Sequence, residues 1–178
     1  MEIKTVLLDN LAVNRALKRI SHEIIENNKG VNNIVLIGIA RGGIPVCQKL
    51  YENIKDIEGV EVPTANLVVT NYRDDVDFRD KSKVEDVEIG VSIVDKDVVL
   101  CDDVLFTGRT VRAGIEAIIK RGRPRTIQLA VLIDRGHREL PIRADYVGKN
   151  VPTSREEIVS VTFDGEGGRA VILKNNKN

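Results

Sequence analysis

The sequence predicts an α/β protein with a mostly parallel central sheet flanked by helices. Three short apolar runs, residues 34–40, 98–101 and 126–133, have the pattern of strands that are buried on both faces. The first two runs are each followed by a turn and an amphipathic helix, and this order is typical of parallel sheets. Because no repeat or low-complexity linker divides the 178 residues, we expect a single domain over residues 1–178.

The other elements are predicted from apolar spacing and turn residues. Residues 12–27 carry apolar side chains at steps of three and four, which predicts an amphipathic first helix. Pro45 fits the first turn of a second helix, where a backbone N–H has no helical partner in any case. Residues 67–70 are β-rich, and short strands are expected near 145–147 and 158–163. The helix after the second apolar run has its expected apolar stripe at Val111, Ile115, Ile118 and Ile119.

Composition excludes several classes of protein. The formal net charge is 0, so bulk charge alone would not bind nucleic acid, although a local basic patch could. No apolar run approaches the roughly 18 residues that cross a bilayer, and residues 1–9 lack the layout of a secretory signal. Cys47 and Cys101 lie in apolar stretches, which favours reduced, buried thiols in a cytoplasmic protein. Two Cys and two His argue against a zinc site.

Residues 73–90 differ from the rest of the chain in their charge. Eleven of these eighteen side chains are charged, four of them basic and seven acidic. Long polar stretches inside a compact domain are often mobile lids or extended arms. A lid over a binding site and a solvated hairpin both agree with this composition.

The segment Val98–Thr110 is the most informative part of the sequence. Two adjacent carboxylates, Asp102 and Asp103, come directly after the buried strand, and ligands of parallel sheets bind beyond the carboxyl ends of the strands. The next residues, 107–110, read Thr-Gly-Arg-Thr and open a helix, whose free N–H groups and dipole suit a phosphate. A ribose phosphate would suit both the acid pair and the helix start, with its hydroxyls on the acids and its 5′-phosphate on the helix. The simpler alternative is that Asp103 or Thr107 caps a helix.

Other phosphate sites fit the sequence poorly. Neither Gly-x-x-x-x-Gly-Lys-[Ser/Thr] nor Gly-x-Gly-x-x-Gly occurs, so an ATPase or a dinucleotide enzyme is not supported. Residues 98–110 instead resemble the signature of the type I phosphoribosyltransferases, which bind 5-phosphoribosyl 1-diphosphate. The chain as a whole resembles the bifunctional pyrimidine operon attenuator and uracil phosphoribosyltransferase family. The stretches that carry this second resemblance are 11–30, 70–75, 98–114 and 127–153, of which 134–153 is especially diagnostic.

The resemblance implies a fold, two activities and a set of partners. The fold would be that of the type I phosphoribosyltransferases, with a small C-terminal hood over the base and a flexible hairpin arm. The protein would make UMP and diphosphate from uracil and 5-phosphoribosyl 1-diphosphate, with Mg²⁺ bound mainly through substrate oxygens rather than in a protein metal site. With UMP bound it would grip an mRNA stem-loop and promote termination of pyrimidine gene transcription, as a homo-oligomer (dimer or tetramer).

The resemblance also assigns catalytic and substrate-binding residues. Asp102 and Asp103 would act on the ribose, and Arg73 would reach the diphosphate when the charged segment closes as a lid. Arg41 would neutralise the diphosphate, although Ala40 stands before it where the family has threonine. The alternative for Arg41 is a surface side chain beside a turn. The expected substrate-binding residues are Arg41, Gly42, Thr107, Gly108, Arg109, Thr110, Asp134 and Arg135.

Basic residues that could bind RNA lie in two parts of the chain. Those of the first helix fall at steps of three and four and share the face opposite its apolar stripe, although a solvated helix face would explain them too. Aromatic residues make up only 3%, so phosphate contacts and loop shape should contribute more than base stacking. The expected RNA-binding residues are Arg15, Lys18, Arg19, His22, His137, Arg138 and Arg143.

Two further functions are compatible with the sequence. One is a salvage phosphoribosyltransferase for another base without RNA binding, which the Ala40-Arg41-Gly42-Gly43 departure leaves open. The other is a regulator whose catalysis is vestigial. Assays of uracil transfer and of UMP-dependent RNA retention would separate all three.

Overall fold

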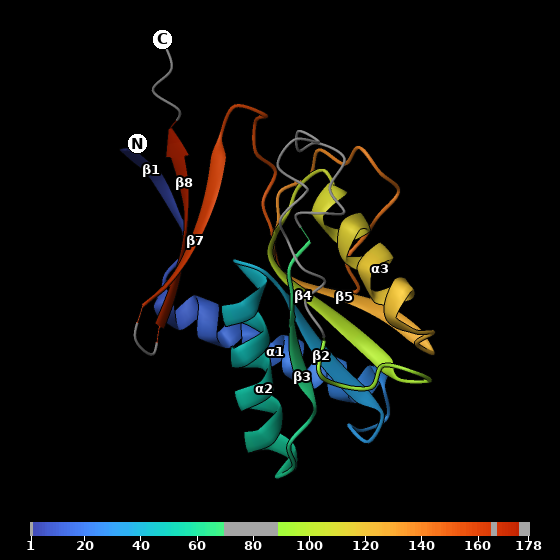
Figure 1. Ribbon diagram of the computed structural model, residues 1–178. Coiled ribbons are helices and arrows are strands. Elements are labelled where there is room, and N and C mark those ends of the chain that lie inside the picture. Colours follow the sequence, from blue (N-terminus) through green and yellow to red (C-terminus); the bar gives the residue numbers. More distant parts are fainter. Residues whose placement is uncertain (1, 70–88, 165–166, 175–178) are drawn as a thin grey trace.

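The computed structural model describes residues 2–69, 89–164 and 167–174, and two sheets form in this part of the chain (Figure 1). The five strands of the central sheet are all parallel. Their order is β3 (Thr64–Leu67), β2 (Ile34–Ile39), β4 (Asp97–Leu105), β5 (Thr126–Asp134) and β6 (Tyr146–Asn150). The small sheet is antiparallel, in the order β1 (Glu2–Leu8), β8 (Gly167–Lys174) and β7 (Ile158–Asp164).

Helices cover both faces of the central sheet. α1 (Asn10–Asn27) and α2 (Gly43–Glu58) pack on one face, and α3 (Arg109–Arg121) packs on the other (Figure 1). Successive residues of β2 and β4 alternate between the two layers of core, with Leu36 and Val99 in the first layer and Val35 and Leu100 in the second. Burial on both faces explains why these strands are continuous apolar runs. The predicted sheet flanked by helices is confirmed.

Two strands differ from their expected bounds because of their neighbours in the sheet. The strand expected at 67–70 is β3, which ends at Leu67 because β2, with which it pairs, ends at Ile39 opposite it. The strand expected to end at Cys101 is β4, which continues to Leu105 because β5 runs beside it that far. The two acids of the motif therefore lie within the last part of β4 and not beyond it.

One residue of the expected α3 stripe is not buried. Ile119 is 60% exposed, while Ala117 and Ile118 are fully buried on the side of α3 that meets the sheet. The apolar stripe therefore includes small residues that the spacing of large side chains did not single out.

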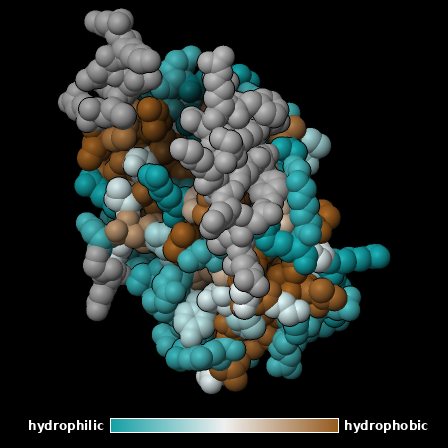
Figure 2. All heavy atoms as spheres, in the orientation of Figure 1, coloured by the Kyte–Doolittle hydropathy of each residue, from teal (hydrophilic) through white to brown (hydrophobic). Residues whose placement is uncertain are grey.

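The small sheet joins the two ends of the described chain. β1 pairs with β8 from Glu2 opposite Lys174 to Leu8 opposite Ala170, and β7 pairs with the other edge of β8. The N-terminal strand β1 therefore belongs to the same small sheet as the C-terminal strands β7 and β8. Hydrophobic residues gather over β1 and β8 in the space-filling view (Figure 2). Ile3 and Val6 of β1 are 49% and 44% exposed.

One expected feature lies outside the described residues. The hairpin arm or lid expected at 73–90, including Arg73, falls almost entirely on residues 70–88, which lie outside the described part. Within that part, none of the helices is long and apolar enough to cross a membrane.

Candidate functional site

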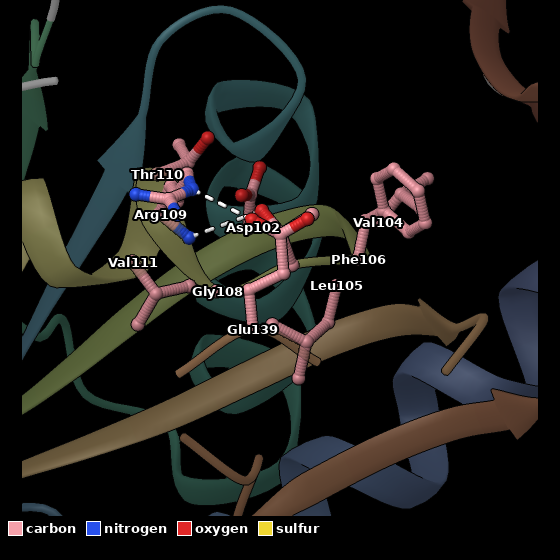
Figure 3. A pocket seen from close by; sticks show the side chains of 10 residues that line it. Asp102, Val104, Leu105, Phe106, Gly108, Arg109, Thr110, Val111 and Glu139 are labelled. Carbon is pink, nitrogen blue, oxygen red and sulfur yellow. Dashed lines mark hydrogen bonds and ion pairs between the residues drawn. The ribbon is translucent and has the colours of Figure 1, made fainter. Parts of the chain in front are cut away.

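A cavity of about 430 Å³ lies where β4 ends and α3 begins (Figure 3). Its lining consists of Asp102, residues 104–111 and Glu139. β4 supplies the acid, the helix start supplies the Thr-Gly-Arg-Thr turn, and the loop between β5 and β6 supplies Glu139. The structure therefore brings Asp102 and the predicted phosphate turn together in one cavity.

The two acids of β4 are held by the backbone amides that come after them. Asp102 is only 6% exposed, and its Oδ1 accepts a 2.9 Å hydrogen bond from the Asp103 N–H. Asp103 is half-buried, and its Oδ1 accepts a 2.8 Å bond from the Val104 N–H. An ionised carboxylate has about four acceptor positions, so one amide bond leaves Asp103 with capacity for hydroxyl donors or a cation.

Glycine occupies the cap position of α3. Gly108 has a φ of 92°, a left-handed conformation that side chains rarely adopt, and no side-chain hydrogen bond caps the helix at this position. Thr107 Oγ1 accepts only a long contact of 3.4 Å from the Arg109 N–H, and Asp103 bonds within its own strand. Capping alone therefore does not account for these residues, and the helix start is open to an anion.

The second predicted substrate loop, residues 41–43, packs directly on β4. A Cβ at Gly42 would lie 2.2 Å from Asp103 Cγ, and a Cβ at Gly43 would lie 2.1 Å from the Cys101 carbonyl oxygen. Only glycine permits the loop to approach the Asp103 side chain and the β4 backbone so closely. Arg41 is exposed at the start of this loop, after a cis peptide bond that joins it to Ala40. The structure thus places Gly42 against the Asp103 side chain, with Arg41 next to it in the chain, and substrate contact by either residue stays a prediction.

Asp134 and Arg135 lie at the end of β5 and do not line the cavity. Arg135 is 5% exposed, and its guanidinium lies 4.0 Å from the ring centroid of Phe106. It donates to Thr153 Oγ1 at 3.0 Å and to the Ser154 carbonyl at 2.7 Å. Burial lowers the pKa of this guanidinium from its usual value. Direct contact of either residue with a substrate stays a prediction.

The segment 135–142 is attached to the loop that comes after β4. Three successive carbonyls of that loop accept hydrogen bonds from the segment. The bonds run from Arg135 N to Leu105 O (3.1 Å), from Arg138 Nη1 to Phe106 O (2.8 Å) and from Glu139 N to Thr107 O (3.0 Å). A Cβ at Gly108 would also lie 3.4 Å from Ile142. The outer side of the phosphate turn is therefore formed by this segment.

Glu139 is a residue of the cavity that the sequence did not single out. Arg109 Nε donates to Glu139 Oε2 at 2.8 Å, and the two side chains face each other while the ring of Phe106 points away (Figure 3). Glu139 lies inside the diagnostic stretch 134–153, but an isolated acid far along the chain from the phosphate turn has no spacing signal that could have found it.

The expected RNA-binding residues of α1 are all on the surface. Arg15, Lys18, Arg19 and His22 are exposed. Arg19 also donates to the carbonyls of Val147 (3.1 Å) and Gly148 (2.7 Å), which ties the basic face of α1 to the edge strand β6. Arg143, from the second group, is exposed as well.

The other two expected RNA-binding residues point inward. His137 Nε2 contacts the Thr153 carbonyl, and its ring lies edge-on to Phe106 with centroids 5.9 Å apart. Arg138 is 23% exposed and donates to Asp134 and to the carbonyls of Ile142 (2.9 Å) and Phe106. In this structure both residues hold the 135–142 segment, and RNA contact by them stays a prediction.

Comparisons with known proteins decide the family. A family model described as a phosphoribosyl transferase domain matches residues 5–164. The chain is 57% identical over 164 residues to the bifunctional protein PyrR of Oceanobacillus iheyensis, with 90% of this chain and 91% of the relative covered. It is 58% identical over 170 residues to the bifunctional protein PyrR of Clostridioides difficile, with 92% and 94% covered. The chain belongs to the PyrR family.

The fold of this PyrR family member is also found in more distant enzymes. The crystal structure of a hypoxanthine phosphoribosyltransferase of Trypanosoma cruzi matches with a TM-score of 0.73 at 20% identity, covering 97% of each chain. A hypoxanthine-guanine phosphoribosyltransferase of Bacillus anthracis matches with a TM-score of 0.72 at 20% identity, covering 96% of this chain and 99% of that chain. At this identity the likeness shows the fold alone, and it confirms the type I phosphoribosyltransferase fold.

Proposed function

We propose that the chain is a UMP-dependent RNA-binding regulator that attenuates transcription of pyrimidine biosynthesis genes. We also propose that it converts uracil and 5-phosphoribosyl 1-diphosphate into UMP and diphosphate. The observation that carries nucleotide binding, which both proposals require, is the cavity that joins Asp102 to the open start of α3, because a ribose 5-phosphate needs these two features together. Relatives at 57% and 58% identity are named bifunctional, which favours this function over a salvage enzyme without a second role.

In the transfer reaction, the uracil ring nitrogen displaces diphosphate at the anomeric carbon of the sugar. The N–H groups of Arg109 and Thr110 and the hydroxyl of Thr107 would hold the 5′-phosphate. Asp102 and Asp103 would accept hydrogen bonds from the ribose hydroxyls and offset the positive charge that develops on the sugar. Arg41 and the backbone of Gly42 would receive the diphosphate, with Arg73 as the lid residue that excludes water.

The donor atoms at this site fit Mg²⁺. The Asp103 carboxylate lies against Gly42 of the diphosphate loop and accepts one amide hydrogen bond, so a hard oxygen donor is present where substrate oxygens would arrive. Mg²⁺ prefers such a mixture of one or two carboxylates, waters and substrate phosphate oxygens. When bound with the substrate it supplies positive charge that neutralises the leaving diphosphate.

The proposed RNA surface is the exposed basic face of α1, and Arg143 is a further exposed candidate in the loop before β6. Arg19 joins α1 to β6, whose exposed Lys149 donates at 3.0 Å to the Leu7 carbonyl, so cations from distant parts of the chain share one region. A surface that binds mainly phosphates loses affinity as salt is added, because counterions are released on binding. Regulation requires that UMP bind the RNA-competent state more tightly than the other state. We propose a homo-oligomer whose subunits share a basic surface that grips an mRNA stem-loop.

The buried cysteines support a cytoplasmic location. Cys47 and Cys101 are both free and buried. Contact with the Cys47 thiol and burial raise the pKa of Cys101 well above its usual value, which keeps this thiol protonated and unreactive. Free, buried thiols in the core agree with a reducing compartment and with a packing role.

Two assays on the same preparation test the proposed function. Labelled uracil is incubated with 5-phosphoribosyl 1-diphosphate and Mg²⁺, and a pyrimidine leader RNA is tested for retention with and without UMP. We expect labelled UMP in the first assay and UMP-dependent retention that weakens steeply with salt in the second. Transfer without retention would support a salvage enzyme, and retention without transfer would support a regulator with vestigial catalysis. A salt-independent retention would contradict the basic surface.

A further inference from the structure

The phosphate-binding part of the cavity contains a carboxylate, Glu139, where positive charge would be expected. The phosphate turn at the start of α3 attracts anions through its free N–H groups and the helix dipole. Glu139 nevertheless lines this cavity. Its carboxylate accepts a hydrogen bond from the Nε–H of Arg109, which belongs to the phosphate turn. Both side chains are about one-third exposed, at 31% and 36%, so an incoming ligand can reach the pair.

Glu139 also belongs to the segment that links the cavity lining to Arg143, one of the expected RNA-binding residues. Its own N–H donates to the Thr107 carbonyl, and the neighbouring Arg138 donates to the Phe106 carbonyl. Arg143 comes later in the same loop and is exposed. A displacement of Glu139 would therefore disturb the two hydrogen bonds that attach this segment to the phosphate turn.

From this geometry we infer that Glu139 is a resident competitor of the nucleotide 5′-phosphate for Arg109, and that its displacement signals to residues 135–143 that a nucleotide is bound. This inference rests on the proposed function and identifies the contact through which nucleotide binding would control RNA binding. Without nucleotide, the Arg109–Glu139 pair holds the segment in the state seen here. With nucleotide, Arg109 turns to the phosphate and Glu139 moves away from it.

In this competition for Arg109, the nucleotide phosphate is favoured over Glu139. An ion pair between partly exposed side chains contributes little to stability. Bonds from a guanidinium to a phosphate are charge-assisted and can be bidentate, so the phosphate is the stronger partner for Arg109. Once Arg109 has turned, Glu139 is left beside a phosphate of like charge, and the repulsion favours a position outside the cavity. Because coupling between two ligands is reciprocal, RNA that prefers the displaced segment tightens nucleotide binding by the same factor.

The test variant is Glu139→Gln, which keeps the size of the side chain and removes its charge. We expect UMP affinity to rise by about three- to tenfold, since the variant removes an ion pair and a like charge of modest strength. Uridine, which lacks the phosphate, should bind the variant and the unchanged protein equally. RNA affinity without UMP should rise, so that the ratio of RNA affinities with and without UMP falls by a factor similar to the gain in UMP affinity.

The matched control is Glu116→Gln on α3. Glu116 accepts from Arg112 at 3.0 Å and pairs with Lys120 at 3.2 Å, is 39% exposed, and does not line the cavity. This variant should leave UMP, uridine and RNA binding unchanged. Glu139→Asp, which keeps the charge on a shorter side chain, should return most of the original UMP affinity and RNA ratio.

The outcomes separate the inference from the proposed function. Unchanged or weaker UMP binding by Glu139→Gln overturns the inference, and so does an equal gain for uridine, because a general loosening would not be selective for the phosphate. If the unchanged protein retains no RNA under any condition, the regulatory function fails, while the comparison of UMP with uridine still decides the competition. Glu139→Ala provides the same readouts if the glutamine variant does not fold.

Discussion

The two ends of β4 carry the same residue type in opposite surroundings. Asp97 begins the strand, and Asp102 and Asp103 lie near its other end. The Asp97 side chain is 3% exposed and accepts from Arg125 Nε at 2.9 Å and from Thr126 Oγ1 at 2.8 Å. The Arg125 guanidinium holds the pKa of the Asp97 carboxyl below its usual value.

Asp103 has no such neutralisation from the side chains that the structure describes. Among these residues its carboxylate accepts only from the Val104 amide, and it lies against the glycine loop of residues 41–43. An acid whose acceptor positions are filled by its own protein stabilises the fold, whereas an acid with spare capacity at the carboxyl end of a parallel strand is available to a ligand. Position along one strand thus separates an aspartate that the fold neutralises from one that we propose to be functional.

The sharpest test of this difference is Asp103→Asn. The amide keeps an oxygen for the Val104 N–H but loses the negative charge that would stabilise the developing positive charge on the sugar. We expect uracil transfer to fall on the order of 100-fold, which is typical for the loss of one electrostatic group in an active site. The free energy of unfolding should change by less than about 0.5 kcal/mol. Steady-state transfer rates and urea titrations measure the two quantities, and unchanged turnover would remove Asp103 from the chemistry.

The reverse pattern is expected for Asp97→Asn. This variant leaves Arg125 and Thr126 without a charged acceptor at a buried position, so we expect a loss of about 1–3 kcal/mol in the free energy of unfolding. Turnover per folded molecule should stay the same, because Asp97 lies at the end of β4 away from the cavity. A loss of turnover without a loss of stability would contradict the assignment of the two ends.

A smaller effect on the free energy of unfolding is expected at acidic pH. Since the folded-state pKa of Asp97 lies below the ordinary 3.8, its contribution to stability is fully present above that value. The contribution is lost as the pH falls through the folded-state pKa. Between about pH 5 and about pH 2, the unchanged protein should therefore lose more unfolding free energy than Asp97→Asn does. Urea titrations across this range measure the difference, and parallel curves would show that the Arg125 contact does not favour the ionised acid.

The sequence predicted the elements whose signals are local. β2, β4 and β5 are buried on both faces, so their residues are apolar without interruption, and the glycines and threonines of the turns mark where the next helix begins. β1 escaped prediction because its order depends on pairing with β8 at the far end of the sequence, and two of its apolar side chains remain exposed.

The residues of the candidate site also fall into those with a local sequence signal and those that are placed by tertiary contacts. Asp102 and the turn 107–110 are close in sequence, and the structure brings them together as predicted. Glu139 and the inward direction of Arg138 depend on how the 135–142 loop folds back on the carbonyls of the β4 loop. Side-chain direction of this kind is set by tertiary hydrogen bonds, which no spacing of residue types encodes.

The pairing of β1 with β8 also has a consequence for synthesis. β1 is synthesised before the central sheet, and β8 only after the whole central sheet has been made. Until then β1 has no partner on the edge that β8 will fill, and unpaired strand edges can associate with other chains. Ile3 and Val6, which stay exposed even after folding, add apolar surface to this unpaired strand.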